Sequence, residues 1–277
     1  MAPRAETVFI FGAGKVGRAL AKALRETRLE VTLRPARGGL PKRIAASFVV
    51  LAVRDRELAT IVAAIAERGL LQPRAVVVHV AGALDASVLA PLRAQCDGVA
   101  QMHPMISFAS TTSFPSLTRG NLHIQGDRAA CSRARAIGKR LGMTPRTIRG
   151  LDPIAYHAAA GLVANGAAAL AAMGAELLAV ANVPQNVAPK LLGPLLRSVA
   201  DNIESLGFPR ALTGPVRRGD AGAVDRAFRL ISARVPHAAA LYVAAVSAQI
   251  PLAEALGEAP PEAWKSLRDW IRARSTE

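Results

Sequence analysis

A glycine-rich turn near the N-terminus constrains the fold of this chain more than any other feature. It reads Gly12-Ala13-Gly14-Lys15-Val16-Gly17, a GxGxxG pattern, and it directly follows the apolar run Thr7 to Phe11. Residues 15–27 then place apolar side chains on one helical face and basic side chains on the other. A buried strand, a glycine turn and a helix in this order predict a parallel α/β unit whose helix N-terminus faces phosphate groups. The turn therefore predicts a dinucleotide site.

Each glycine of the turn is required for a different physical reason. Gly12 makes the tight turn, Gly14 lets the backbone approach a pyrophosphate, and Gly17 lets the helix pack closely on the strand. Small Ala52 and its neighbour Val53 end a later strand at the same sheet edge, where a cofactor would lie against the backbone. The predicted cofactor-binding residues are Gly12, Ala13, Gly14, Lys15, Val16, Gly17, Arg34, Arg37, Ala52 and Val53. The alternative is a packing turn without a ligand.

The end of the second predicted strand, Val31 to Leu33, favours NADP(H) over NAD(H). An acidic residue usually ends this strand in NAD-binding proteins and holds the ribose 2′-hydroxyl, but Glu30 lies at its start. Arg34 and Arg37 follow the strand instead, and a planar guanidinium group suits a 2′-phosphate. The alternative is that both arginines are solvated surface residues.

Strands and helices alternate as far as residue 150, and only helices follow. Short apolar runs predict strands at 7–11, 31–33, 47–53, 75–80, 98–102, 122–125 and 144–148. Helical spacing recurs between them and then predicts helices at 153–182, 185–206, 221–234, 236–256 and 261–274. We expect an α/β domain with a mostly parallel sheet over residues 1–150 and an all-α domain over residues 151–277.

Positive charge is concentrated in the first half of the chain. Of the net charge of +15, residues 1–150 carry +14 (23 Lys and Arg against 9 Asp and Glu) and residues 151–277 carry +1 (12 against 11). A dinucleotide with an extra phosphate would account for part of this excess. The basic segment 128–149 suggests nucleic-acid binding as an alternative, but aromatic residues make up only 4% and no binding motif is recognisable. We interpret that segment as solvated surface and expect no nucleic acid partner.

Cysteine content and hydropathy favour a cytoplasmic protein. The two cysteines, Cys96 and Cys131, are too few for a disulfide scaffold and show no metal-ligand spacing, so we expect a reducing compartment and no metal. The first apolar run is too short for a signal peptide. Residues 158–182 are long enough to span a membrane, but they consist mainly of Ala and Gly, with Asn165 in the middle. We expect a buried or dimer-forming helix and no membrane contact.

Two histidines and an asparagine are the candidate catalytic residues. His103 follows a predicted strand in a predicted loop, and Ser107 is a candidate substrate residue in the same loop. Histidine suits proton transfer beside hydride transfer because its pKa lies near neutrality. His157, Gly161 and Asn165 step by four and share one helical face, where the glycine leaves a gap for a substrate. The alternative is that the polar side chains are hydrogen-bonded within a helical core.

A polar loop, Thr213 to Asp220, interrupts the helices of the second half. Thr213 and Asp220 are candidates to orient a substrate, and either Arg217 or Arg218 could hold a carboxylate; we favour Arg218. The alternative is helix capping, with Asp220 at an N-cap.

These segments together resemble a known bacterial family. The matching segments, in order, are GAGKVG at 12–17, HPMISF at 103–108, YHAAAGLVANGAAAL at 156–170 and ALTGPVRRGD at 211–220. They are similar to proteins with a Rossmann-like domain followed by a domain of unknown function, DUF2520. The resemblance implies kinship with pyrroline-5-carboxylate reductases and β-hydroxyacid dehydrogenases. It also implies a C-terminal domain like that of 6-phosphogluconate dehydrogenase, which forms the dimer and closes the active-site cleft.

One position departs from the β-hydroxyacid dehydrogenase pattern. Those enzymes carry a catalytic lysine four residues before an asparagine, whereas here Gly161 precedes Asn165. A lysine-based mechanism is therefore not expected, and His157 or His103 remains as proton donor. The HPM segment is similar to a short motif of prephenate dehydrogenases, which stays a minor alternative, and deazaflavin cofactors occur among distant Rossmann relatives.

We therefore expect an NADP(H)-dependent oxidoreductase that transfers hydride between the nicotinamide and a small carbonyl, imine or hydroxy acid. The expected assembly is a homodimer through the helical domain. The alternative is a non-catalytic NADP-binding redox sensor or regulatory dimer.

Overall fold

The computed structural model describes residues 6–274 of the chain. It divides into two compact units, Met1–Ala164 and Asn165–Glu277. The last strand ends at Arg146 and the first long helix begins at Pro153, so the strands give way to helices between these two residues. The first unit continues into the first turns of that helix, because Tyr156 and His157 pack against a histidine of the sheet.

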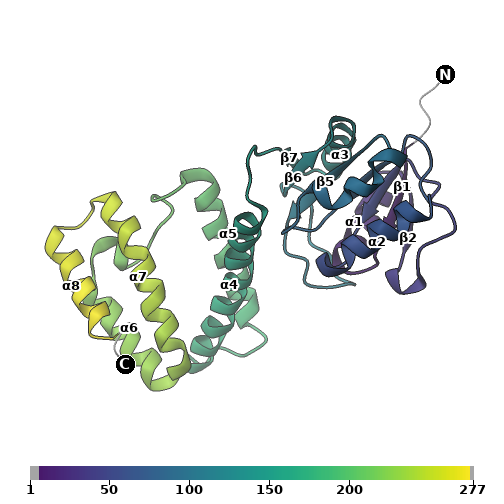
Figure 1. The fold of residues 1–277 in the computed structure, drawn as a ribbon. Coiled ribbons are helices and arrows are strands. Elements are labelled where there is room, and N and C mark those ends of the chain that lie inside the picture. Colours follow the sequence, from purple (N-terminus) through teal and green to yellow (C-terminus); the bar gives the residue numbers. More distant parts are fainter. Residues whose placement is uncertain (1–5, 275–277) are drawn as a thin grey trace. The chain divides into compact units, whose positions relative to one another are not determined.

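The first unit is built on one seven-stranded sheet in the order β2-β1-β3-β4-β5-β6-β7 (Figure 1). The strands are β1 (Thr7–Phe11), β2 (Glu30–Arg34), β3 (Phe48–Leu51), β4 (Val76–His79), β5 (Gly98–Met105), β6 (Asn121–Gly126) and β7 (Thr144–Arg146). All neighbouring pairs are parallel except β5 and β6. The predicted fold class, a Rossmann-type α/β domain with a mostly parallel sheet followed by a helical domain, is confirmed.

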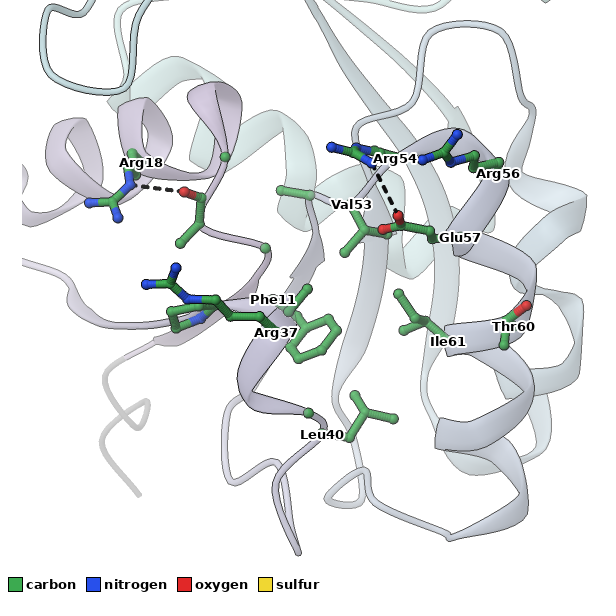
Figure 2. Close-up of a pocket in the computed structure, with 17 residues that line it drawn as sticks. Phe11, Arg18, Arg37, Leu40, Val53, Arg54, Arg56, Glu57, Thr60 and Ile61 are labelled. Atoms are coloured by element: carbon green, nitrogen blue, oxygen red, sulfur yellow. Dashed lines mark hydrogen bonds and ion pairs between the residues drawn. The ribbon is translucent and has the colours of Figure 1, made fainter.

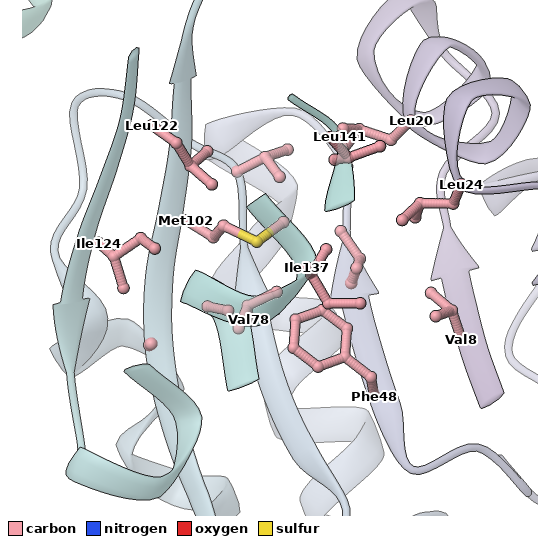
Figure 3. Close-up of a cluster of buried hydrophobic side chains, with 14 of the residues drawn as sticks. Val8, Leu20, Leu24, Phe48, Val78, Met102, Leu122, Ile124, Ile137 and Leu141 are labelled. Atoms are coloured by element: carbon pink, nitrogen blue, oxygen red, sulfur yellow. The ribbon is translucent and has the colours of Figure 1, made fainter. Parts of the chain in front are cut away.

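Helices cover both faces of this sheet, as the continuous apolar strands require. α1 (Lys15–Glu26) and α3 (Arg128–Arg140) pack on one face, and their buried side chains join those of the strands in a single cluster (Figure 3). α2 (Asp55–Glu67) and the 3₁₀ segment η2 (Ala86–Gln95) pack on the other face. The central strands β3 and β4 are buried along their whole length, and because they pair in parallel, their carboxyl ends lie at the same edge of the sheet.

One local prediction for the first unit is wrong, and one segment was not predicted. His103 and Pro104 do not form a loop, because β5 continues to Met105 and pairs with β6, placing His103 opposite His123. The antiparallel partner comes later in the chain and extends the strand past the proline, which local pattern could not indicate. The η2 segment was also not predicted; Pro91 lies inside it, and its helical pattern is weak.

The second unit is helical. It contains the rest of α4 (Pro153–Val180), then α5 (Ala188–Leu206), α6 (Ala221–Arg234), α7 (Ala239–Leu256) and α8 (Pro261–Arg272), with short 3₁₀ turns at Val216–Arg218 and Pro236–Ala238. Its core forms where α6, α7 and α8 meet, around Trp264, Leu267 and Trp270. A smaller cluster packs Ile231 and Val235 against Met173 and Leu177 of α4.

Two helical segments, Pro153–Val180 and Pro236–Leu256, are long and apolar enough to cross a membrane by length and composition. Core and interface helices pass the same test, so this property alone does not assign a membrane span. No described residue of α4 is buried within the single chain, although α4 is rich in Ala and Gly. Apart from the contacts of Met173 and Leu177, much of the apolar surface of α4 is therefore exposed in one copy of the chain, including Leu162, Val163 and Leu170.

Candidate functional site

The glycine turn opens onto a cavity of about 820 Å³ at the carboxyl edge of β1 and β3 (Figure 2). Its lining comes from the turn, the loop after β2, the end of β3 and the first turns of α2. The lining residues are Phe11, Gly12, Ala13, Gly14, Arg18, Pro35, Ala36, Arg37, Gly39, Leu40, Ala52, Val53, Arg54, Arg56, Glu57, Thr60 and Ile61. A pocket of this size at this edge of an open α/β sheet is where such folds bind ligands.

The geometry of the turn explains its glycines. Gly12 has φ +113°, and a Cβ there would overlap the carbonyl oxygen of Ala52. A Cβ at Gly17 would overlap the carbonyl oxygen of Gly12, so the close approach of helix and strand also requires a glycine. By contrast, a Cβ at Gly14 would meet no atom within 4 Å. The space beside Gly14 is open, and α1 begins at Lys15 without a side-chain cap, so its first N–H groups are available to an anion.

Arginines give the cavity a positive rim. Arg18, Arg37, Arg54 and Arg56 line it, and Glu57 is the one acidic residue in the lining, with its carboxylate 3.8 Å from Arg54 Nη1. Because the lining carries four guanidinium groups and one carboxylate, the electrostatic potential in the cavity is positive and favours an anionic ligand.

The structure separates the predicted cofactor residues into those inside and outside the cavity lining. Gly12, Ala13, Gly14, Arg37, Ala52 and Val53 line the cavity. Lys15, Val16, Gly17 and Arg34 do not; Gly17 is buried behind the turn, and Arg34 donates to backbone carbonyls of the loop after β2. Sequence reasoning missed Arg18, which it placed on the solvent face of the helix, and also Arg54, Arg56 and Thr60. The position of Arg54 and Arg56 just after a strand end was the available signal.

A cluster of histidines lies on β4, β5 and β6 at the carboxyl end of β4. The His103 ring lies 5.7 Å from the Tyr156 ring and 6.1 Å from the His157 ring, centroid to centroid, while the His123 ring lies 5.5 Å from Tyr156. The remaining member, His79, is fully buried and its Nε2 lies 3.0 Å from the carbonyl oxygen of Asp85. The structure thus brings together the predicted candidates His103 and His157.

Gly82 marks the point at which the two candidates converge. A Cβ on Gly82 would lie 2.5 Å from His157 Nδ1 and 2.7 Å from His103 Nε2. The two ring nitrogens are therefore no farther apart than the sum of these distances, close enough for one small polar atom to bond to both. His79 and His123 were not among the predicted residues; single histidines within apolar strands were the available signal.

Burial keeps the cluster neutral. Burial first, and then the neighbouring His157, His123 and His79, lower the pKa of His103 from 6.5 to about 4. Burial also lowers the pKa of His79 and the pKa of His123. His103 is therefore uncharged near pH 7 and can donate or accept a hydrogen bond there. The side chain of His157 is exposed to solvent.

Among the described residues of the loop at 213–220, Arg217 and Asp220 serve the local structure. Arg217 forms a bidentate pair with Glu258, at 2.5 and 2.8 Å, and also donates to the carbonyl oxygen of Leu212. Asp220 caps α6 by accepting a hydrogen bond of 2.8 Å from the N–H of Ala223, which was the alternative interpretation of this residue. Thr213 and Arg218 are exposed side chains of the same loop.

The last two predicted residues are exposed side chains. Asn165 is exposed at the border of the second unit, and Ser107 is exposed in the loop that follows β5. In the described part of the chain, no three His, Cys, Asp or Glu side chains gather closely enough to hold a metal ion.

Two family models match segments of the chain. Residues 40–104 match the model of the Rossmann-like domain, and residues 121–249 match that of a domain of unknown function, DUF2520. The chain thus combines a Rossmann-like domain with a DUF2520 domain, and the predicted resemblance is confirmed. A search of curated proteins finds no match.

Solved structures share the fold over nearly the whole chain. A proposed NADP oxidoreductase from Bacteroides fragilis is 20% identical, with a TM-score of 0.69 over 89% of this chain and 98% of its own. An imine reductase from Myxococcus stipitatus in complex with NADP⁺ is 15% identical, with a TM-score of 0.57 over 90% and 93%. A pyrroline-5-carboxylate reductase from Coxiella burnetii is 15% identical, with a TM-score of 0.53 over 91% and 99%. At these identities the comparisons establish the fold.

Proposed function

We propose that the protein is an NADP(H)-dependent oxidoreductase acting on a small carbonyl, imine or hydroxy acid. One observation carries the proposal: the glycine turn, the open helix N-terminus and an arginine-rimmed cavity of about 820 Å³ occupy one edge of a Rossmann-type sheet. The names of the structural relatives, which include an NADP⁺ complex, support the same cofactor class.

The residues present fit this cofactor. The open space at Gly14 and the first N–H groups of α1 would receive the pyrophosphate, and the arginines of the rim would receive a further phosphate. Small Ala52 lines the cavity at the end of β3 and lets a ligand lie against the backbone. When bound, NADPH supplies a hydride from its nicotinamide.

His157 is the proposed proton donor, and His103 is the proposed hydrogen-bonding partner of the substrate. His157 is exposed to solvent, whereas His103 stays neutral near pH 7 because its pKa is about 4. The oxygen or nitrogen atom of the substrate that gains the proton would bond to both ring nitrogens above Gly82. We retain Ser107, Asn165, Thr213 and Arg218, all exposed, as candidates to hold the rest of the substrate. The capping contact of Asp220 leaves it the weakest of the predicted substrate residues.

NADPH oxidation tests the proposal. The protein is mixed with NADPH and a panel of cyclic imines, keto acids and aldehydes, and absorbance of the reduced nicotinamide is followed. We expect turnover with at least one compound and its loss, by about 100-fold or more, in His157→Ala. The matched control is His237→Ala, because His237 is exposed and pairs with Glu176 in the second unit. Tight NADPH binding without turnover of any compound would favour the redox-sensor alternative.

We also propose that the helical unit forms a homodimer. Leu191, Leu195, Val199 and Ile203 repeat every four residues along one face of α5, and each is 38–58% exposed. Apolar side chains in such a row usually mark an interface. A second copy is the occupant we favour, because α4, which is rich in small residues, also exposes Leu162, Val163 and Leu170. Both cysteines are free, which fits the cytoplasm as the compartment.

A further inference from the structure

Two arginines in the loop after β2 lie in different environments. Arg34 donates from Nε to the carbonyl oxygen of Gly39 at 2.6 Å and from Nη2 to that of Gly38 at 2.8 Å. Both acceptors belong to the turn Ala36–Gly38 and its cap Gly39, the turn that carries Arg37. Arg34 is thus committed to the backbone of this turn and does not line the cavity.

Arg37 and Arg18 are placed differently. Both are exposed side chains that line the cavity, one from the turn after β2 and one from the first turns of α1. Arg18 Nε donates to the carbonyl oxygen of Ala13 at 2.8 Å, which holds the side chain beside the glycine turn and leaves its terminal nitrogens without a hydrogen-bond partner among the described residues. In Figure 2 both side chains lie on the left of the view, on the side of the cavity formed by the glycine turn and the loop after β2.

We propose that Arg18 and Arg37 together bind the additional ribose phosphate of NADP(H), and that Arg34 is a positioning residue. Arg34 holds the turn Ala36–Gly38 so that Arg37 faces the cavity, and it does not contact the phosphate itself. Two planar guanidinium groups can surround one phosphate with charge-assisted hydrogen bonds, which a ribose hydroxyl would not receive with the same strength. This inference rests on the proposed function and names the residues that set its cofactor preference.

Equilibrium binding of NADPH and NADH tests this division of roles. We expect Arg18→Ala and Arg37→Ala each to weaken NADPH binding by about 10- to 100-fold, the range of one or two hydrogen bonds between charged groups. NADH affinity should stay within about twofold of the parent's in both variants, because the lost contacts serve only the extra phosphate. The matched control is Arg128→Ala, which removes an exposed arginine of α3 outside the cavity.

A double-mutant cycle separates positioning from contact. If Arg34 acts through Arg37, then Arg34→Ala weakens NADPH binding on its own, but the double variant binds no more weakly than Arg37→Ala. Arg34→Lys keeps the charge but cannot span both carbonyl oxygens, so it should lose as much NADPH affinity as Arg34→Ala. Circular dichroism confirms that each variant is folded before its affinities are compared.

Additive losses in the double variant, or full recovery in Arg34→Lys, would show that Arg34 supplies charge to the phosphate and would overturn the proposal. Retained NADPH preference in both Arg18→Ala and Arg37→Ala would also overturn it while leaving the proposed function intact. A parent protein that binds NADH as tightly as NADPH would refute the proposed cofactor as well as this assignment.

Discussion

Replacing His103 with glutamine is expected to reduce the acid sensitivity of the Rossmann unit. In the folded protein the pKa of His103 is about 4, and in the unfolded chain it is near 6.5. Above pH 6.5 both states are neutral and the folded state keeps its full stability. As the pH falls from 6.5 towards 4, the unfolded chain binds a proton that folded His103 does not, so stability falls.

The size of the effect follows from the two pKa values. A difference of about 2.5 units corresponds to about 3 kcal/mol in total, of which about 2 kcal/mol is lost between pH 7 and pH 5. The variant His103→Gln lacks the titrating group, so its free energy of unfolding should fall by about 2 kcal/mol less than the parent's over this range. His237→Gln, in the second unit, should behave like the parent.

The assay must report on the first unit. Both tryptophans, Trp264 and Trp270, lie in α8, so intrinsic fluorescence follows the second unit instead. Amide hydrogen exchange of β4 and β5 in urea, at pH 7 and pH 5, measures the local free energy of opening. Equal losses of stability in the parent and in His103→Gln, within about 0.5 kcal/mol, would refute the assignment of a neutral, buried His103.

Three further changes test other parts of the structure. Gly82→Ala inserts a Cβ between His103 Nε2 and His157 Nδ1, so turnover should fall at least about tenfold while NADPH affinity stays within about twofold; unchanged turnover would refute the paired-histidine site. Asp220→Ala removes the cap of α6 and should cost the second unit about 1 kcal/mol, measured by tryptophan fluorescence in urea, with NADPH affinity unchanged. Leu195→Asp places a charge in the apolar row of α5 and should halve the mass measured by light scattering, whereas a parent that is already monomeric would contradict the homodimer.

The sequence predicted the features that depend on local pattern. Apolar runs located the parallel strands, because most of these strands are buried. The GxGxxG pattern located the glycine turn, because the backbone conformation at Gly12 and the close packing at Gly17 leave no room for a side chain. The continuation of β5 through His103 was missed, since it depends on pairing with β6, about twenty residues further along the chain.

The directions in which side chains point could not be predicted from the sequence. The sequence placed Arg34 and Arg37 together after β2, but only the structure shows that Arg34 bonds to the backbone while Arg37 lines the cavity. The same holds for Arg217 and Arg218, which are adjacent in sequence; Glu258, the partner of Arg217, lies 41 residues away. Which of two neighbouring arginines is held by the protein depends on contacts with other segments of the chain. The periodicity of the sequence carries no information about these contacts.

A structure of the protein with NADPH bound is the most direct test of the proposed oxidoreductase site. We expect the pyrophosphate beside Gly14, the additional phosphate between Arg18 and Arg37, and the nicotinamide C4 within about 5–6 Å of His103 or His157, the reach of direct or one-water proton transfer to a substrate. A cofactor bound elsewhere, or a nicotinamide ring that lies beyond this distance from both histidines, would contradict the proposed oxidoreductase site.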